Sequence, residues 1–251
     1  MANTVERFSN RVANYVKYRP GYPHEVLELT RKEMGITQGS AIADIGSGTG
    51  LSAKLFLENG HTVYGVEPNA AMRAAAKEYL SEFSNFRSID GTAEATRLPE
   101  SSVDLIIAAQ AFHWFEPAGT RKEFKRIVKD GGYVALIWNE RQLDTTPFLI
   151  DYEKLLLKYG KDYEKVRHEN ITDDVLEAFF HTPFHRATFH NEQVFGLEGL
   201  KGRLLSSSYM PAETDDAFEP MVRELRLLFA KHAENAKIKV FYDTNVFYCR
   251  L

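Results

Sequence analysis

The sequence predicts an α/β fold: a Rossmann-like, mostly parallel sheet with helices on both faces, antiparallel strands at the C-terminal end, and a helical cap. Two observations lead to this prediction. Short apolar runs alternate with helical segments between residues 41 and 138, and a glycine-rich turn directly follows the first run. The length of 251 residues fits one such sheet with extra helices, so we expect a single domain.

Two helices are expected before the first strand. Apolar side chains at helical spacing over residues 4–18 predict the first helix. Pro20 and Pro23 end it, because proline lacks an N–H group and restricts the residue before it. The second helix covers residues 24–34 and ends at Gly35, so residues 1–37 are interpreted as an N-terminal helical lid.

Residues 38–140 are predicted to form the cofactor-binding core. Its expected strands are short apolar runs with turn residues near their ends, as is typical of buried parallel strands. Asn69 suits a helix cap and Pro117 a first helical turn, and Asp130–Gly131–Gly132 is predicted to end the helix that begins at Pro117. The predicted strands cover 41–45, 62–67, 86–89, 103–109 and 133–138, with helices over 51–57 and 69–80.

The alternation of strands and helices changes after residue 140. Residues 141–235 are interpreted as cap helices and a sixth strand, and residues 236–251 as a closing strand with a break at Asp243–Asn245. No internal repeat or low-complexity linker marks a second domain. Helices are expected near 147–159, 172–180, 197–205 and 215–233, and strands over 185–195 and 238–250.

Composition and charge narrow the classes of function. The net charge of −4 provides no basic field for a phosphate backbone, so we expect no nucleic-acid partner. Cys249 is the single cysteine, and no segment suits a signal peptide or a membrane span, so we expect a cytoplasmic protein without a membrane partner. Pro183 breaks any helix that would align His181 with His185, so no metal site is predicted. The oligomeric state is left open.

The glycine-rich turn is the most informative motif. It reads Asp44-Ile-Gly46-Ser-Gly48-Thr-Gly50 and lies between an expected strand and an expected helix, where glycines allow a ligand to approach the backbone. A dinucleotide fingerprint has two residues before its third glycine, whereas this run has one. Asp44 would repel a pyrophosphate but suits an ammonium group. Spacing and charge therefore favour S-adenosylmethionine over NAD.

Glu67 supports a site for adenosine, but its position does not distinguish S-adenosylmethionine from NAD. It ends the second expected strand, 19 residues after Gly48, where a carboxylate can accept both ribose hydroxyls. Glu67-Pro68-Asn69 could equally be a plain strand-to-helix turn. Considered together with the glycine loop, Glu67 is better interpreted as a binding residue.

The ordered set of motifs resembles the class I S-adenosylmethionine-dependent methyltransferases. Within them it is similar to the type-11 group that includes trans-aconitate methyltransferase-like proteins. The resemblance covers about two-fifths of the chain, from residue 41 to residue 139. Its motifs are Asp44–Gly50, Val66–Asn69, Gly91-Thr92-Ala93-Glu94, Leu98-Pro99 before Val103–Leu105, Gln110–Phe115 and Lys129–Gly132.

The resemblance implies a cofactor site built around the glycine loop. Adenosine would lie between Glu67 and the 91–94 loop, and the methionine end near Asp44 and Gln110. Many relatives hold the adenine amine with an aspartate after the third strand, but this chain has Thr92 there with Glu94 nearby, so that contact stays open. The predicted cofactor-binding residues are Arg19, Asp44, Gly46, Ser47, Gly48, Gly50, Glu67, Pro68, Thr92, Ala93, Glu94 and Gln110.

His113 is the candidate catalytic residue. It follows the fourth expected strand among aromatic residues, and histidine titrates near neutral pH, so it suits a general base. In the alternative, residues 112–115 form a packed aromatic turn and His113 bonds only to a backbone carbonyl. Of the two functional roles, we favour lining the pocket over acting as a base. Predicted substrate-binding residues are Tyr18, Tyr22, Trp114, Asn139, Arg141 and Tyr209.

The predicted activity is transfer of a methyl group to a small-molecule acceptor, with a carboxylate or a hydroxyl as the accepting group. Two alternatives keep the fold. A regulator could bind S-adenosylmethionine or S-adenosylhomocysteine without turnover, and an NAD-dependent oxidoreductase could use the same type of crevice. Turnover would distinguish the first alternative and NAD binding the second.

Overall fold

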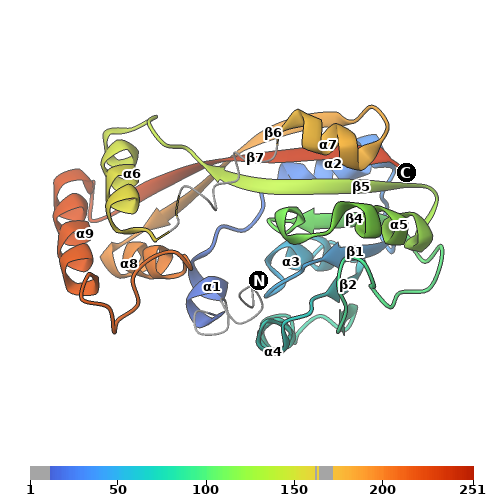
Figure 1. The fold of residues 1–251 in the computed structure, drawn as a ribbon, viewed down its shortest axis with the longest axis horizontal. Coiled ribbons are helices and arrows are strands. Elements are labelled where there is room, and N and C mark those ends of the chain that lie inside the picture. The colour runs from blue at the N-terminus through green and yellow to red at the C-terminus, as the bar shows by residue number, and fades with distance from the viewer. Residues whose placement is uncertain (1–11, 162, 164–171) are drawn as a thin grey trace. The chain divides into compact units, whose positions relative to one another are not determined.

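The computed structural model describes residues 12–161, 163 and 172–251 (Figure 1). Within them the chain alternates strands and helices up to β5 and then adds helices and two long strands. The elements before β5 are α1 Val12–Tyr18, α2 His24–Met34, β1 Ala41–Ile45, α3 Leu51–Leu57, β2 Thr62–Val66, α4 Ala70–Tyr79, β3 Phe86–Ile89, β4 Val103–Ala109, the 3-10 turn η2 Phe112–Trp114 and α5 Pro117–Ile127. The later elements are β5 Val128–Arg141, α6 Pro147–Tyr159, α7 Asp173–Phe180, β6 His185–Phe195, α8 Leu197–Leu205, α9 Phe218–His232 and β7 Ile238–Arg250.

The described strands form one seven-stranded sheet in the order β3-β2-β1-β4-β5-β7-β6. Strands β1 to β5 are parallel, and β7 runs against β5, as the arrows in Figure 1 show. The strand order reverses direction between β1 and β4, and ligands of open α/β sheets bind in the crevice at such a reversal. The predicted fold class, with antiparallel strands at the C-terminal end, is confirmed.

The chain segments cluster into two compact units that share β5, β6 and β7. Unit 1 contains residues 1–20, 140–168 and 190–243, and unit 2 contains residues 21–139, 169–189 and 244–251. The organisation as one domain stays a prediction.

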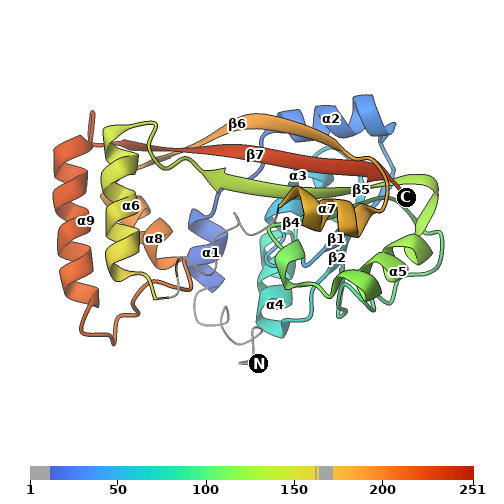
Figure 2. The ribbon, with the colours of Figure 1, turned by 45° about the horizontal axis from the view of Figure 1, so that its top comes forward.

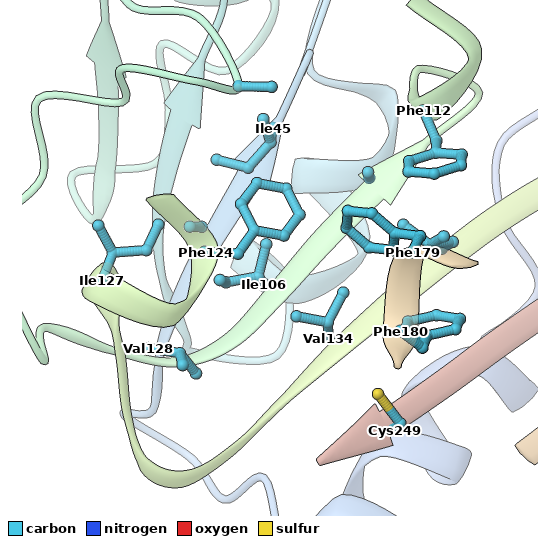
Figure 3. Packing of buried hydrophobic residues seen from close by; sticks show 14 of the residues in the cluster. Ile45, Ile106, Phe112, Phe124, Ile127, Val128, Val134, Phe179, Phe180 and Cys249 are labelled. Carbon is cyan, nitrogen blue, oxygen red and sulfur yellow. The ribbon is translucent and has the colours of Figure 1, made fainter. Parts of the chain in front are cut away.

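Unit 2 has a hydrophobic layer on each face of its sheet. Alternate side chains of one strand point to opposite faces, so Ile42 of β1 packs on the side of α2 and α3, and Ala43 on the side of α5 and α7. Figure 2 shows α7 in front of the strands and α2 behind them. On the α5 and α7 side, Phe124, Phe179 and Phe180 pack with residues of four strands, Ile45, Ile106, Val134 and Cys249 (Figure 3).

Unit 1 has its own core, formed by α6, α8, α9 and the ends of β6 and β7. Helices α6 and α9 pack through Leu149, Tyr152, Met221 and Leu225. Helix α1 packs on α8, where a Cβ at Gly202 would lie 2.1 Å from the ring of Tyr18. Glycine is therefore required at this crossing.

Most predicted elements are confirmed, and two predictions about boundaries are wrong. Helix α5 ends at Ile127, and Asp130–Gly131–Gly132 lies in a bulge of β5, where the register shifts between Val103 and Leu105 of β4. Gly131 has φ +75°, which suits such a bulge. Strand β7 runs through Asp243–Asn245 without the predicted break, because its pairing overrides the local preference for a turn. Residues 4–11 of the first predicted helix lie outside the described residues.

Candidate functional site

The loop between β1 and α3 lies at the carboxyl end of β1, beside the point where the sheet order reverses. Gly46, Gly48 and Gly50 have φ values of +67°, +54° and +84°, which residues with a side chain rarely adopt. The N–H groups of Gly46 and Ser47 donate to the Val66 carbonyl at 2.8 and 3.2 Å. The loop is therefore tied to the end of β2.

The three glycines are required for different reasons. A Cβ at Gly46 would lie 2.6 Å from the Ala111 Cβ, and a Cβ at Gly50 would lie 2.5 Å from the Leu80 Cδ1. A Cβ at Gly48 would meet no protein atom within 4 Å. The packing of unit 2 therefore excludes side chains at Gly46 and Gly50, whereas the space next to Gly48 is open to a ligand.

Asp44 is a buried carboxylate with one unused oxygen. Its residue is 0% exposed, and its Oδ2 accepts a hydrogen bond from the Ser52 hydroxyl at 2.6 Å. Its Oδ1 is sealed from solvent and accepts no hydrogen bond in the described chain. Burial raises the pKa of Asp44 to about 7 and the charge of Glu67 adds to the rise, whereas the Ser52 hydroxyl and the Ala53 backbone N–H oppose it. This oxygen is suited to a cationic donor from a ligand.

Glu67 binds the glycine loop from the end of β2. Its Oε2 accepts the N–H of Gly48 at 3.0 Å, and its Oε1 accepts the N–H of Asn69 at 2.8 Å. Burial raises the pKa of Glu67, and these two backbone N–H groups oppose the rise. A carboxylate has about four lone-pair positions, so both oxygens retain capacity to accept ligand hydroxyls.

Arg73 and Ser52 support the two carboxylates and were missed by sequence reasoning. Arg73 donates from Nη1 to the carbonyls of Glu67 and Pro68 at 2.8 and 2.7 Å, and it pairs with Asp90 at 3.1 Å. Ser52 lies in the first turn of α3, eight residues after Asp44. Both residues are polar and lie in the first turn of a helix that follows a strand, and this position in the sequence could have indicated them.

The predicted adenine loop is a tight turn after β3. Thr92 and Ala95 form a bridge, Thr92 is exposed, and Ala93 is buried. The Glu94 carboxylate accepts the N–H of Glu116 at 2.9 Å at the start of α5. Burial raises the pKa of Glu94, but its hydrogen bonds outweigh this effect and the pKa is lowered. Glu94 is thus an ionised side chain that also orders the start of α5.

Gln110 and Asn139 connect neighbouring strands of unit 2. Gln110 has φ +57° and donates from Nε2 to the Asn139 carbonyl at 3.0 Å. Asn139 donates to the Gly21 carbonyl at 3.0 Å and accepts from the Thr244 hydroxyl at 2.5 Å. The side chain of Asn139 is therefore used in internal hydrogen bonds, and its role in substrate binding stays a prediction.

His113 and Trp114 lie in η2, directly after β4. His113 is exposed, Trp114 is 46% exposed, and their ring centroids are 4.5 Å apart. Phe112 and Phe115 pack below them on the hydrophobic layer that contains α5. The turn therefore presents one aromatic pair outward and holds the other in the core.

The remaining predicted residues are divided between the units. Tyr22 belongs to unit 2 and packs on the layer with α2 and α3. Tyr18, Arg19, Arg141 and Tyr209 belong to unit 1, so their predicted roles in binding cofactor and substrate stay predictions.

The comparisons show that part of this chain is similar to methyltransferases. Residues 43–136 match a family described as "Methyltransferase domain". An uncharacterised methyltransferase-like protein of Schizosaccharomyces pombe is 32% identical over 159 residues, which cover 63% of this chain and 60% of that protein. An uncharacterised methyltransferase of Mycobacterium tuberculosis is 32% identical over 134 residues, covering 53% of this chain and 52% of that protein. The match thus spans between half and two-thirds of these relatives.

Solved structures support the same fold. A putative type II methyltransferase from Anaeromyxobacter dehalogenans has a TM-score of 0.67 at 20% identity, over 93% of this chain and 98% of that one. A putative methyltransferase from an antibiotic biosynthesis pathway of Anabaena variabilis has a TM-score of 0.63 at 23% identity, over 94% and 100%. Residues 43–136 are therefore similar to S-adenosylmethionine-dependent methyltransferases. The narrower likeness to trans-aconitate methyltransferase-like proteins stays a prediction.

The residues of unit 2 fit the cofactor of this class. S-adenosylmethionine carries an ammonium group, which matches the unused Oδ1 of Asp44, and ribose hydroxyls, which match the acceptors of Glu67. Among the described residues, no three histidine, cysteine or acidic side chains gather closely enough to hold a metal ion. In the same part of the chain, no helix has the length and apolarity that crossing a bilayer requires.

Proposed function

We propose that this protein transfers a methyl group from S-adenosylmethionine to a small-molecule acceptor through a carboxylate or a hydroxyl group. The observation that carries this proposal is the unused, buried oxygen of Asp44 at the base of a glycine loop that Glu67 holds in place. A buried carboxylate without a full set of partners is costly to maintain, and a ligand cation relieves that cost.

Three parts of unit 2 bind the cofactor in this proposal. Asp44 accepts from the ammonium group, Glu67 accepts from the ribose hydroxyls, and the turn that contains Thr92 and Ala93 lies next to adenine. The backbone of Gly48 provides close approach, since no protein atom fills the space where its Cβ would be.

When bound, S-adenosylmethionine supplies a methyl group on a positively charged sulfur. The protein then has to hold the acceptor in line with that group and to exclude water. Positioning of this kind accounts for roughly 7–11 kcal/mol of a reaction barrier. A general base contributes about 10²- to 10⁴-fold in rate, and only for an acceptor that has to lose a proton.

His113 is the residue proposed to act on the acceptor. Its exposed imidazole lies at the carboxyl end of β4, where ligands of this fold bind. For a hydroxyl acceptor, His113 takes the hydroxyl proton on a ring nitrogen. For a carboxylate acceptor, no base is needed and His113 only lines the site.

Calorimetric titration tests the cofactor assignment. The full-length protein is titrated with S-adenosylmethionine, S-adenosylhomocysteine and NAD. Binding of the first two without NAD is expected, and binding of NAD alone, or of none of the three, refutes the assignment.

A matched pair of glycine variants locates the bound cofactor. Gly39 and Gly48 both have positive φ, +88° and +54°, and a Cβ at either would meet no protein atom within 4 Å. Gly39→Ala and Gly48→Ala therefore carry a similar backbone cost. Only Gly48→Ala is expected to weaken cofactor binding, because only this Cβ enters the proposed site.

Turnover tests the enzymatic part of the proposal. Formation of S-adenosylhomocysteine is followed with panels of small carboxylic acids and phenols. Cofactor binding without turnover on every member of both panels would favour a regulator over an enzyme.

A further inference from the structure

His61 of unit 2 is a fully buried histidine that the proposed function does not use. It lies between α3 and β2 and is 0% exposed. Both ring nitrogens are sealed from solvent, and neither has a hydrogen-bond partner among the described residues. The ring of Phe56 meets the imidazole edge-on, with the two centroids 6.0 Å apart. His61 is thus a titratable group in an apolar place, where a charge without a partner is costly.

A tight corner of the backbone holds His61 in this place. Its N–H donates to the Phe56 carbonyl at 3.2 Å, and its carbonyl accepts from the Asn85 side chain. The next residue, Thr62, begins β2 and donates to the Ser40 carbonyl at 3.2 Å. The imidazole is therefore fixed beside Phe56, which belongs to the hydrophobic layer with α2 and α3.

Arg31 of α2 makes this place unfavourable for a second positive charge. Its guanidinium donates to Glu28 at 2.9 Å and to the Asn59 side chain at 3.4 Å. Burial lowers the pKa of His61, the charge of Arg31 lowers it further, and the Ser40 backbone opposes both effects. The Ser40 carbonyl lies outside hydrogen-bonding geometry with the ring. The buried imidazole is therefore held in its neutral form at neutral pH.

The elements around the corner offer no anion to a protonated His61. Residues 35–40, which precede β1, carry no charged side chain. The other charged side chains around the corner have partners of their own. They are Glu28, which pairs with Arg31 and His24, and Lys54, which pairs with Glu58 and lies near the charge of Glu82. A proton on His61 would thus add a buried positive charge close to Arg31 without a compensating partner.

The corner is connected to the glycine loop through both of its elements. Helix α3 has seven residues and begins directly after Gly50. Strand β2 has five residues and ends at Val66, whose carbonyl accepts the N–H groups of Gly46 and Ser47. Opening of the corner at His61 would therefore release elements that hold the loop at both of its ends.

We propose that His61 is an acid-sensitive latch of unit 2: protonation of its imidazole opens the corner between α3 and β2 and loosens the glycine loop. In the open corner water solvates both N–H groups of the imidazolium, so a proton favours the open form. The stability that the neutral ring provides is complete above about pH 6.5, the pKa of an exposed histidine, and is lost as pH falls below it. Only the effect on cofactor binding rests on the proposed function, since the latch itself follows from unit 2 alone.

Hydrogen exchange of the full-length protein, followed peptide by peptide at pH 5, 6 and 7.5, tests the latch. Each rate is divided by the intrinsic exchange rate at its pH. Below about pH 6.5, exchange of residues 51–66 is expected to rise by up to about tenfold per pH unit. Residues 103–109 of β4, in the centre of the same sheet, are expected to show no such rise. An equal rise in β4, or no rise in residues 51–66, overturns the proposal.

Two neighbouring residues of α2 provide matched variants. Arg31→Gln removes the charge that acts on His61, and Lys32→Gln removes the same charge one position further along; the two side chains are 41% and 84% exposed. Loss of the Arg31 hydrogen bonds acts at every pH, so the ratio of exchange at pH 5 to exchange at pH 7.5 is compared. This ratio is expected to fall several-fold in Arg31→Gln and to stay at the parent value in Lys32→Gln. Equal ratios in the two variants contradict the proposal.

His61→Leu removes the proton site itself. The acid-induced rise in exchange of residues 51–66 is expected to disappear in this variant, and its persistence would refute the latch. Titration of the His61 ring by NMR in the parent keeps the test valid if His61→Leu does not fold. The ring is expected to titrate below pH 6.5, and titration at or above that value overturns the proposal.

The connection to the glycine loop is tested with S-adenosylhomocysteine. Saturation with this ligand is expected to slow exchange of residues 51–66 at pH 5, because a ligand that binds only the closed form opposes opening. Unchanged exchange in the saturated protein would overturn the connection between corner and loop. An acid response that His61→Leu removes, in a protein that binds neither S-adenosylmethionine nor S-adenosylhomocysteine, would support the latch and refute the proposed function.

Discussion

The Asp44→Asn variant separates two effects of the buried carboxylate, its effect on the free energy of unfolding and its effect on cofactor affinity. In the folded protein the pKa of Asp44 is raised from 3.8 to about 7, chiefly by burial. Between these two values the unfolded chain has lost the Asp44 proton and the folded chain retains it. Stability therefore falls as pH rises from about 4 to about 7, and stays level above that range as far as Asp44 is concerned.

The size of this effect follows from the two pKa values. At 1.36 kcal/mol per pH unit, the difference between 3.8 and about 7 corresponds to about 4 kcal/mol of unfolding free energy. The Asp44→Asn variant does not titrate. Relative to the parent, the variant is therefore expected to gain about 4 kcal/mol between pH 4 and pH 8. An unpaired amide N–H at the former Oδ1 subtracts about 1–3 kcal/mol at every pH.

Cofactor binding should change in the opposite direction. Below about pH 7, binding of the ammonium group requires Asp44 to lose its proton, so affinity is expected to fall by about tenfold per pH unit. Above about pH 8 the ammonium group itself deprotonates and affinity falls again. The Asp44→Asn variant should bind weakly at every pH and lack the acidic limb of this profile.

Two measurements check this reasoning. Urea unfolding without cofactor, at pH 4, 6 and 8, gives the stability difference between parent and variant. Calorimetry with S-adenosylmethionine over the same range gives the affinity profile. A stability difference that does not change with pH would refute the raised pKa, and parent-like cofactor affinity in the variant would remove Asp44 from the site.

Three further predictions test the loop, the candidate catalytic residue and a structural ion pair. Gly46→Ala is expected to lower the melting temperature and the cofactor affinity together, since its Cβ would lie 2.6 Å from the Ala111 Cβ and its φ is +67°; an unchanged melting temperature would contradict this packing. His113→Ala is expected to retain cofactor affinity and to lower turnover about 10²- to 10⁴-fold on a hydroxyl acceptor; unaltered turnover on that acceptor would refute its role as a general base. Arg126 lowers the pKa of Glu123 to about 2, so the stability that this carboxylate provides is present above pH 4.5 and lost as pH falls toward 2. Glu123→Gln should therefore be less stable than the parent at pH 7, by a margin that narrows at low pH in denaturant titrations.

The sequence alone determined the core of unit 2. Strands β1, β3 and β4 and helix α3 have the predicted bounds. Turn-forming residues mark the ends of these elements, and β1 and β4 are in addition short, mostly apolar runs. The glycines of the loop and the cap at Asn69 were predictable for the same reason. The backbone preference of a residue affects only a few neighbouring positions, so it can be predicted from the local sequence.

Only the tertiary structure decided which side chains meet. The bulge at Gly131 and the unbroken course of β7 depend on pairing with neighbouring strands, which outweighs local turn preference. The contact of Arg203 with Tyr242 joins residues 39 positions apart, and that of Arg19 with Ser206 joins residues 187 apart. No local pattern marks such pairs, because their geometry and the burial of their charges arise only when distant segments pack together.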